Sequence, residues 1–146
     1  PMNTLTRALV TAACLLVGTF AYSAEGATQG SAEESTAIAQ SWLKMVDDGD
    51  YAASWKNSAA RFQASINEAQ WIAAMEKVRR PLGHAASREL LDATASATAP
   101  RQPAGAYWIV RFKTAFEGVT AHEIVTLVAD ADGKWRPVGF LIRPAS

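Results

Sequence analysis

The chain contains 146 residues, a length that suits one domain and is too short for two ordinary ones. Its 14 basic and 14 acidic residues balance, so no net charge favours nucleic acid or an anionic membrane as partner. Five tryptophans and five phenylalanines supply bulky apolar side chains for a single core.

The first residues have the order of a secretory signal peptide. A single cation, Arg7, precedes an apolar run over residues 8–20, and small residues follow at Ser23 and Ala24. The run is shorter than the roughly 20 apolar residues of a membrane-spanning helix. We therefore expect residues 1–24 to be cleaved and the protein to be periplasmic or secreted. An N-terminal helix retained as a membrane anchor is the alternative.

Residues 25–30 are small and polar and are expected to tether the cleavage site to a single α+β domain over residues 31–146. The only cysteine, Cys14, lies inside the signal segment. Once that segment is removed, the domain has no thiol for a disulfide, a thiolate metal site or a nucleophile.

The next 50 residues carry the signals of three helices. Ser31 and Glu34 have capping-box spacing, and a broad apolar stripe around Trp42 follows, so the first helix starts after Ser31. Gly49 suits the residue just past a helix end. Asp50 suits the cap of a second helix over residues 51–60.

The third helix is expected to start after Asn67, which stands three residues before Gln70. It should end where Pro81 and Gly83 interrupt the helical pattern. On a helical wheel Arg79 falls on the apolar side of this helix, so we expect its guanidinium to be directed toward the core.

The period changes after Gly83, and we expect four strands over residues 88–95, 107–116, 119–129 and 134–143. A two-residue connection containing Gly118 predicts a tight hairpin between the second and third strands. Pro137 has no backbone N–H, which places the last strand at an edge or beside a β-bulge.

A two-residue hairpin loop fixes the pairing of Phe112 with Glu123, of Val110 with Val125, and of Trp108 with Leu127. Together these strands form one apolar face, interrupted by Thr114 and Glu123, which Val138, Phe140 and Ile142 of the last strand should join. The opposite face carries Arg111, Lys113, Thr120, His122 and Thr126, so at least half of it should be exposed to solvent. The expected fold class is α+β, with three N-terminal helices on one face of a curved four-stranded antiparallel sheet.

Glu123 is the strongest chemical signal in the chain. An isolated carboxylate on the core face must be paired, neutral or in a pocket, since a buried lone charge is very unfavourable. Arg79 or Arg136 is the expected partner. In a cleft, Glu123 would suit a general acid or base. The alternative is a structural ion pair, or a place at the rim of the sheet.

Other groups give weaker signals. Tyr51 and Trp55 stand on one side of the second helix and, with Glu123 and Arg79, are possible pocket-lining residues, although aromatic side chains at helical spacing are more often core.

The acidic turn at Asp47, Asp48 and Asp50 lacks the ligand ladder of a calcium loop and is better explained by helix capping. Two separated histidines, His84 and His122, are weak grounds for a metal site. The motifs GxSxG, GxGxxG, HExxH and the P-loop are absent, so we predict no catalytic residues, metal or cofactor.

Several separated blocks resemble a bacterial family known as domain of unknown function 4019. They are WLKMVDDGDYAASW, QWIAAMEKVRRPLGHAASREL, YWIVRFKTAF and DGKWRPVGFLI. The resemblance implies a secreted or envelope protein with a domain similar in outline to cystatin-like or NTF2-like cones. It brings no catalytic residues. In cone folds a pocket often lies between the helices and the concave sheet face, which is a fold-level analogy only.

The leading functional hypothesis is a non-enzymatic envelope protein that binds a partner protein or small ligand. It predicts that Glu123 is salt-bridged or at the rim of the sheet. The first alternative is a small-pocket lyase or isomerase with Glu123 as acid or base and Arg79 or Tyr51 holding an oxyanion. The second is an accessory subunit anchored to a membrane complex by its N-terminal helix.

Overall fold

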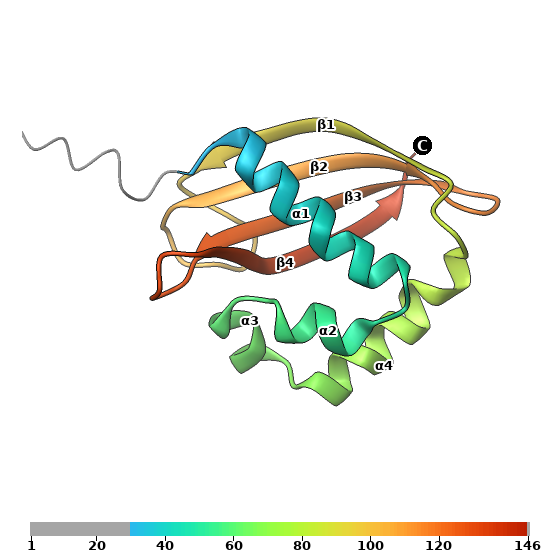
Figure 1. The fold of residues 1–146 in the computed structure, drawn as a ribbon, viewed down its shortest axis with the longest axis horizontal. Helices are drawn as coiled ribbons and strands as arrows, with labels where there is room; N and C mark the ends of the chain where they lie inside the picture. Colours follow the sequence, from blue (N-terminus) through green and yellow to red (C-terminus); the bar gives the residue numbers. More distant parts are fainter. Residues whose placement is uncertain (1–29, 146) are drawn as a thin grey trace, which may run out of the picture.

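A computed structural model describes residues 30–145 (Figure 1). The predicted signal segment, residues 1–24, therefore lies outside the described residues. The described part contains four α-helices, namely α1 (Ala32–Asp47), α2 (Tyr51–Lys56), α3 (Ala60–Ser65) and α4 (Glu68–Val78), and the 3-10 turn η1 (Arg80–Leu82). The strands are β1 (Ser87–Ser96), β2 (Tyr107–Ala115), β3 (Thr120–Ala129) and β4 (Trp135–Pro144).

The strands form one antiparallel sheet in the order β1-β2-β3-β4. Helix α1 crosses one face of this sheet and contacts all four strands, while α2, α3 and α4 gather beyond the β4 side (Figure 1). The predicted α+β class, with the helices preceding a four-stranded sheet, is confirmed.

The predicted caps are present at three helix starts. Ser31 accepts a hydrogen bond from the Glu34 amide at 3.0 Å, and Asp50 accepts from the Ala53 amide at 3.0 Å. Asn67 makes a complete capping box with Gln70. These polar side chains replace the helical acceptors that the first amides lack, which explains why the helices begin at these residues.

The predicted second helix over residues 51–60 is wrong: α2 and α3 are separate. The amide of Ala59 donates to the Pro137 carbonyl of β4 at 2.7 Å, and the amide of Ala60 donates to the Asp130 carboxylate at 3.2 Å. Acceptors from β4 and from the β3–β4 connection thus replace the helical acceptors at this point, so the chain bends and starts a new helix.

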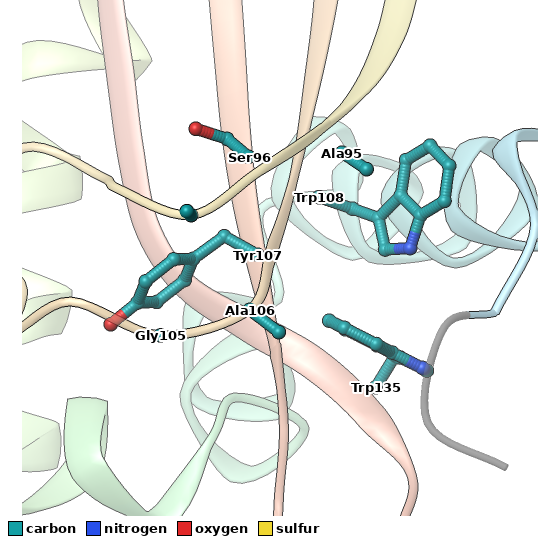
Figure 2. A pocket seen from close by; sticks show the side chains of 8 residues that line it. Ala95, Ser96, Gly105, Ala106, Tyr107, Trp108 and Trp135 are labelled. Atoms are coloured by element: carbon teal, nitrogen blue, oxygen red, sulfur yellow. The ribbon is translucent and has the colours of Figure 1, made fainter. Parts of the chain in front are cut away.

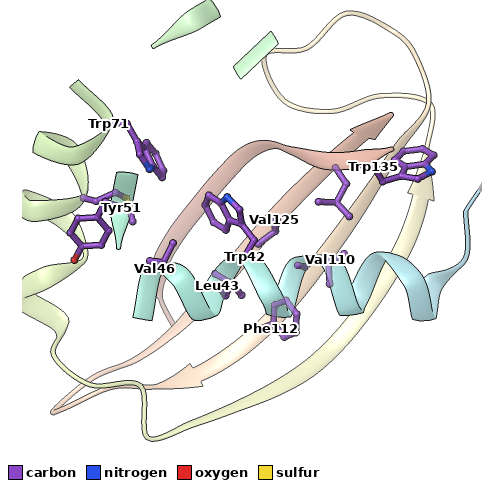
Figure 3. Packing of buried hydrophobic residues seen from close by; sticks show 12 residues of the cluster. Trp42, Leu43, Val46, Tyr51, Trp71, Val110, Phe112, Val125 and Trp135 are labelled. Carbon is purple, nitrogen blue, oxygen red and sulfur yellow. The ribbon is translucent and has the colours of Figure 1, made fainter. Parts of the chain in front are cut away.

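The main core lies between α1 and the sheet (Figure 3). Trp42, Leu43 and Val46 of α1 are almost fully buried against Val110 and Phe112 of β2 and their neighbours Val125 and Leu127 of β3. Tryptophan N–H groups in this core have acceptors, since those of Trp42 and Trp71 both donate to Ser54, at 2.8 and 2.9 Å. Burial of large side chains with satisfied polar tips is what stabilises such a core.

The hairpin register is the predicted one, pairing Phe112 with Glu123 and Trp108 with Leu127. The prediction for Val138 is wrong. A β-bulge in β4, where Thr126 pairs with Gly139 but Leu127 pairs with Pro137, moves Val138 out of the alternation. It packs in a second cluster of buried residues with Ala59, Ala99, Tyr107 and Val128. Pro137 is thus both on an edge strand and beside a bulge, as its missing N–H requires.

Candidate functional site

Glu123 points from β3 into the core between α1 and the sheet, and its side chain is 0% exposed. Its Oε1 atom accepts hydrogen bonds from the Thr114 hydroxyl at 2.5 Å and from Arg88 Nε at 2.9 Å. Arg88 Nη2 also lies 2.8 Å from the same oxygen. The prediction that Arg79 or Arg136 pairs with Glu123 is therefore wrong, because the partner of Glu123 is Arg88.

Arg88 also reaches the C-terminal end of α1. Its Nη1 and Nη2 atoms donate to the two carboxylate oxygens of Asp47 at 2.8 and 3.0 Å. Arg79 Nη2 donates to Asp47 Oδ1 at 3.1 Å. We call Asp47, Arg79, Arg88 and Glu123 the ionic cluster. It joins the end of α1, the end of α4, β1 and β3, and its two cations balance two anions.

Arg79 is directed inward, as predicted, and its side chain is 4% exposed. Besides Asp47, its guanidinium donates to the Gly83 carbonyl at 2.6 Å and lies 4.6 Å from the centre of the Phe116 ring. A planar cation with several donors suits such a site, because it can bind a carboxylate, a carbonyl and an aromatic face at once. The other expected partner, Arg136, lies at the opposite end of β4, where it pairs with Asp130 and Asp132.

The charges of the ionic cluster stabilise one another. Burial alone raises the pKa of Asp47, but hydrogen bonds and charges of Arg88 and then Arg79 outweigh this effect, so the pKa lies below 3.8. Burial likewise lowers the pKa of Arg88, and Asp47 and Glu123 together more than offset it. Both groups therefore stay charged at neutral pH, as in a structural ion pair.

The cluster offers little for catalysis. Glu123 lines neither of the two cavities described below, and the hydroxyl nearest to it, that of Thr114, is also fully buried. A general acid or base must come within hydrogen-bond reach of its substrate. Two buried atoms of the cluster, Glu123 Oε2 and Arg79 Nε, have no hydrogen-bond partner among the described residues.

The aromatic residues proposed for a pocket belong to the core. Tyr51 is 5% exposed and packs in the main cluster. Trp55 is half-buried against that cluster, and its indole donates to the Ile66 carbonyl at 2.8 Å. Neither residue lines one of the two cavities described below, and Glu123 does not line them either. Within residues 30–145, no three His, Cys, Asp or Glu side chains are grouped as metal ligands.

A cavity of about 300 Å³ lies at the other end of the sheet, where β2 and β4 begin (Figure 2). Two indoles, those of Trp108 and Trp135, face it together with small residues of β1 and of the loop before β2. We call it the indole cavity, lined by Ala95, Ser96, Ala97, Gly105, Ala106, Tyr107, Trp108 and Trp135. Sequence reasoning missed it because Trp135 of β4 is far along the chain from the β1–β2 connection that forms the other wall.

A second hollow, of about 350 Å³, lies between the first half of α1 and the edge strand β1. Leu90 and Ala93 of β1 contribute its sheet side, opposite small and polar side chains of α1. Leu90 is 43% exposed, and the neighbouring Leu91 is 44% exposed at a β-bulge in β1. This hollow is a shallow surface feature of the helix–strand contact.

Comparison with known proteins places the chain among its relatives. The model of the family described as "Protein of unknown function (DUF4019)" matches residues 38–140. The chain belongs to this family. The match covers most of α1, all of α2, α3 and α4, and the residues of the ionic cluster and of the indole cavity of this DUF4019 domain.

No significant match is found among curated proteins or among solved structures. The likeness to cystatin-like or NTF2-like cones therefore stays a prediction. No helix in residues 30–145 of the DUF4019 chain has the length and apolar content to cross a membrane.

Proposed function

We propose that this DUF4019 protein is an exported, non-enzymatic binding protein of the bacterial cell envelope. The observation that supports the proposal best is the position of Glu123. This carboxylate, which the sequence marked as a candidate for acid–base chemistry, is fully buried and bound to Arg88 and Thr114. A carboxylate in this position supports the structure. The indole cavity, which has no charged lining residue, is a separate hollow at the other end of the sheet.

Replacing Glu123 by glutamine separates a structural role from a catalytic or ligand-binding one. The substitution keeps the shape of the side chain but removes the charge that Arg88 faces. Because hydrogen bonds to charged groups contribute about 1.5–3 kcal/mol, we expect Glu123→Gln to lower the free energy of unfolding by a similar amount. Urea unfolding of the purified protein measures this value.

The same variant should keep its binding partners. Wild-type and Glu123→Gln protein isolated from the native envelope at a temperature where both are folded should carry the same co-purifying molecules. Glu89→Gln, an exposed carboxylate on β1, is the matched control and should change neither property. If Glu123→Gln loses bound molecules or a detectable turnover while its stability is unchanged, the non-enzymatic proposal is wrong.

Export is tested by the mass of the protein from its native cells. The proposal expects a chain that begins at Ala24 or Glu25, the residues after the two cleavage positions. An intact N-terminal segment in the membrane fraction would support the anchored alternative instead.

A further inference from the structure

We propose that the outer edge of β1 binds an extended segment of another protein, in which a lysine or arginine stands two residues before an apolar residue. The segment lies antiparallel to β1 as a fifth strand of the sheet. The inference rests on the proposed binding function and goes beyond it, because it assigns the surface and the chemistry of the partner. Three features support it, namely the unpaired backbone of β1, the apolar hollow beside it and the charge of that hollow.

The outer edge of β1 has unpaired backbone groups. β1 pairs with β2 alone, and within residues 30–145 no backbone hydrogen bond from outside the sheet reaches residues 92–96. The bulge at Leu91 bounds this regular part of the edge. The other edge strand, β4, is less available, because it contains Pro137, whose carbonyl accepts from the Ala59 amide. An unpaired edge is a template to which a further strand can add.

Exposed apolar side chains accompany this edge. Leu90 and Leu91 are 43% and 44% exposed, and they lie next to one another in the chain. Leu90 and Ala93 form the sheet side of the hollow of about 350 Å³ between α1 and β1, and Ala37 belongs to its helix side. Exposed apolar side chains that adjoin one another beside a groove are typical of a contact surface.

The pairing of the strands decides which partner side chain enters the hollow. Directly paired residues of neighbouring strands point to the same face of a sheet. Ala93 pairs with the buried Val110 of β2 and packs against the main core, so it faces α1. A residue that pairs with Ala93 from an added strand also faces α1 and enters the hollow. An apolar side chain there covers Leu90.

The charge of the hollow favours a cation next to this apolar side chain. Glu33 is exposed and lines the hollow, and no basic residue lines it. The last residue of α1, Asp47, meets the start of β1 at Arg88, so the first turn of α1, with Glu33, lies toward Ala95 at the other end of β1 (Figure 1). In an antiparallel segment, the residue opposite Ala95 stands two before the apolar one. A lysine or arginine at that position has a charge complementary to Glu33.

A second copy of this chain does not supply such a segment. Its sheet has two edge strands, β1 and β4. In β1 the only cation is Arg88, which the ionic cluster binds, and Glu89 and Asp92 are acidic. In β4 the pairing groups are interrupted by Pro137 and a bulge. The partner is therefore another protein.

A short peptide, acetyl-Thr-Thr-Lys-Thr-Leu-Thr-Thr-amide, is a suitable probe. Added to isotope-labelled protein expressed from the full-length chain, it should shift the backbone amide NMR signals of residues 90–96. It should also slow hydrogen exchange at the outward-facing amides of β1, which contact of side chains alone would not do. The signal of Val125, which is fully buried in the sheet, should stay in place as an internal control.

Modified peptides test each feature separately. Replacing the leucine by alanine should weaken binding at least about fivefold, because apolar burial is lost. Replacing the lysine by glutamate should weaken it about threefold to tenfold. In an antiparallel pair, alternate residues direct their amides toward and away from the neighbouring strand. Of two peptides N-methylated at alternate residues, one should therefore lose binding and the other keep it.

Two pairs of protein variants test the place of binding. Ala37 is exposed, so Ala37→Leu should fill the hollow and block the peptide without changing the unfolding midpoint. Ala106→Leu, an exposed residue of the indole cavity, is its matched control and should bind as wild type does. Glu33→Gln should abolish the preference for the lysine peptide over the glutamate peptide. Glu34→Gln, beside it but not lining the hollow, should keep that preference.

The inference is overturned if the peptide shifts no β1 signal, if both methylated peptides bind equally, or if Ala37→Leu binds as well as wild type. Equal binding of the lysine and glutamate peptides to wild type would also overturn it. A wild-type chain that sediments as a dimer, with Ala37→Leu monomeric, would overturn it in favour of a second copy. None of these results bears on Glu123, so the non-enzymatic proposal stands or falls by its own experiment.

Discussion

At the residue scale, the ionic cluster explains how a carboxylate can lie in the core of a small domain. A lone buried charge is strongly unfavourable, whereas a charge with a well-placed partner and further hydrogen bonds is tolerated. Glu123 has Arg88 as its partner and the Thr114 hydroxyl as an additional donor. Arg88 in turn is shared with Asp47, so three elements meet at one guanidinium.

The cluster predicts how stability depends on pH. The pKa of Asp47 lies below 3.8 in the folded protein, so the folded state binds its proton less readily than the unfolded state. Its contribution to stability is therefore present above pH 3.8 and is lost as the pH falls through the folded value. We expect the difference in unfolding free energy between wild type and Asp47→Asn to shrink below pH 3.8.

Chemical unfolding of both proteins between pH 7 and pH 2 measures that difference. Asp92 and Asp132 also have lowered pKa values beside Arg111 and Arg136, but both proteins retain them, so they cancel in the comparison. A difference that stays constant over the whole range would show that Asp47 is not ionised against the two arginines.

At the scale of the elements, acceptors distant in sequence decide where α3 begins. Its N-cap residue, Ala59, has no side chain that can accept, and the Asp130 carboxylate of the β3–β4 connection accepts from the Ala60 amide instead. A cap from a residue 70 positions away ties this short helix to the sheet. Capping interactions of this kind contribute about 1 kcal/mol.

We expect Asp130→Ala to destabilise α3 selectively. The amide of Ala60 and its neighbours in α3 should exchange with deuterium faster, while those of α1 keep their protection. Asp132→Ala is the matched control, because Asp132 also binds Arg136 but is not an acceptor for the Ala60 amide. Equal exchange rates in α3 for both variants would contradict the cap.

The sequence allowed correct prediction of the elements that depend on local signals. Caps at Ser31, Asp50 and Asn67 set three helix starts, and the short hairpin loop set the pairing of Phe112 with Glu123. The break between α2 and α3 and the bulge at Val138 depend on partners far away in the chain. A local pattern does not contain these partners.

The candidate site was predicted in part for the same reason. The hairpin register placed Glu123 on the core face, but its partner Arg88 comes from β1, whose pattern is weak and contains a bulge. Nothing near Arg88 in the sequence marks it as the partner of a buried carboxylate. Arg79 leaned toward the core as the helical wheel predicted, yet its carboxylate, Asp47, is at the end of another helix.

At the scale of the whole molecule, the charged and the uncharged features lie far apart. Asp47 is at the last residue of α1, and the indole cavity lies near its first residues. A helix of 16 residues spans about 24 Å. The ionic cluster thus fastens one end of the sheet to the helices, while the other end is left with an accessible hollow. This separation supports binding at one end and structural support at the other.

The accessibility of Glu123 tests this account most directly. A water-soluble carbodiimide with a glycine ester modifies carboxylates that solvent reaches, and mass spectrometry of peptides locates the modified residues. In the folded protein we predict that exposed Glu34 and Glu89 react while Glu123 stays unmodified until the protein unfolds. Modification of Glu123 at the rate of Glu34 in folded protein would contradict the account, since it would place the carboxylate in an open pocket.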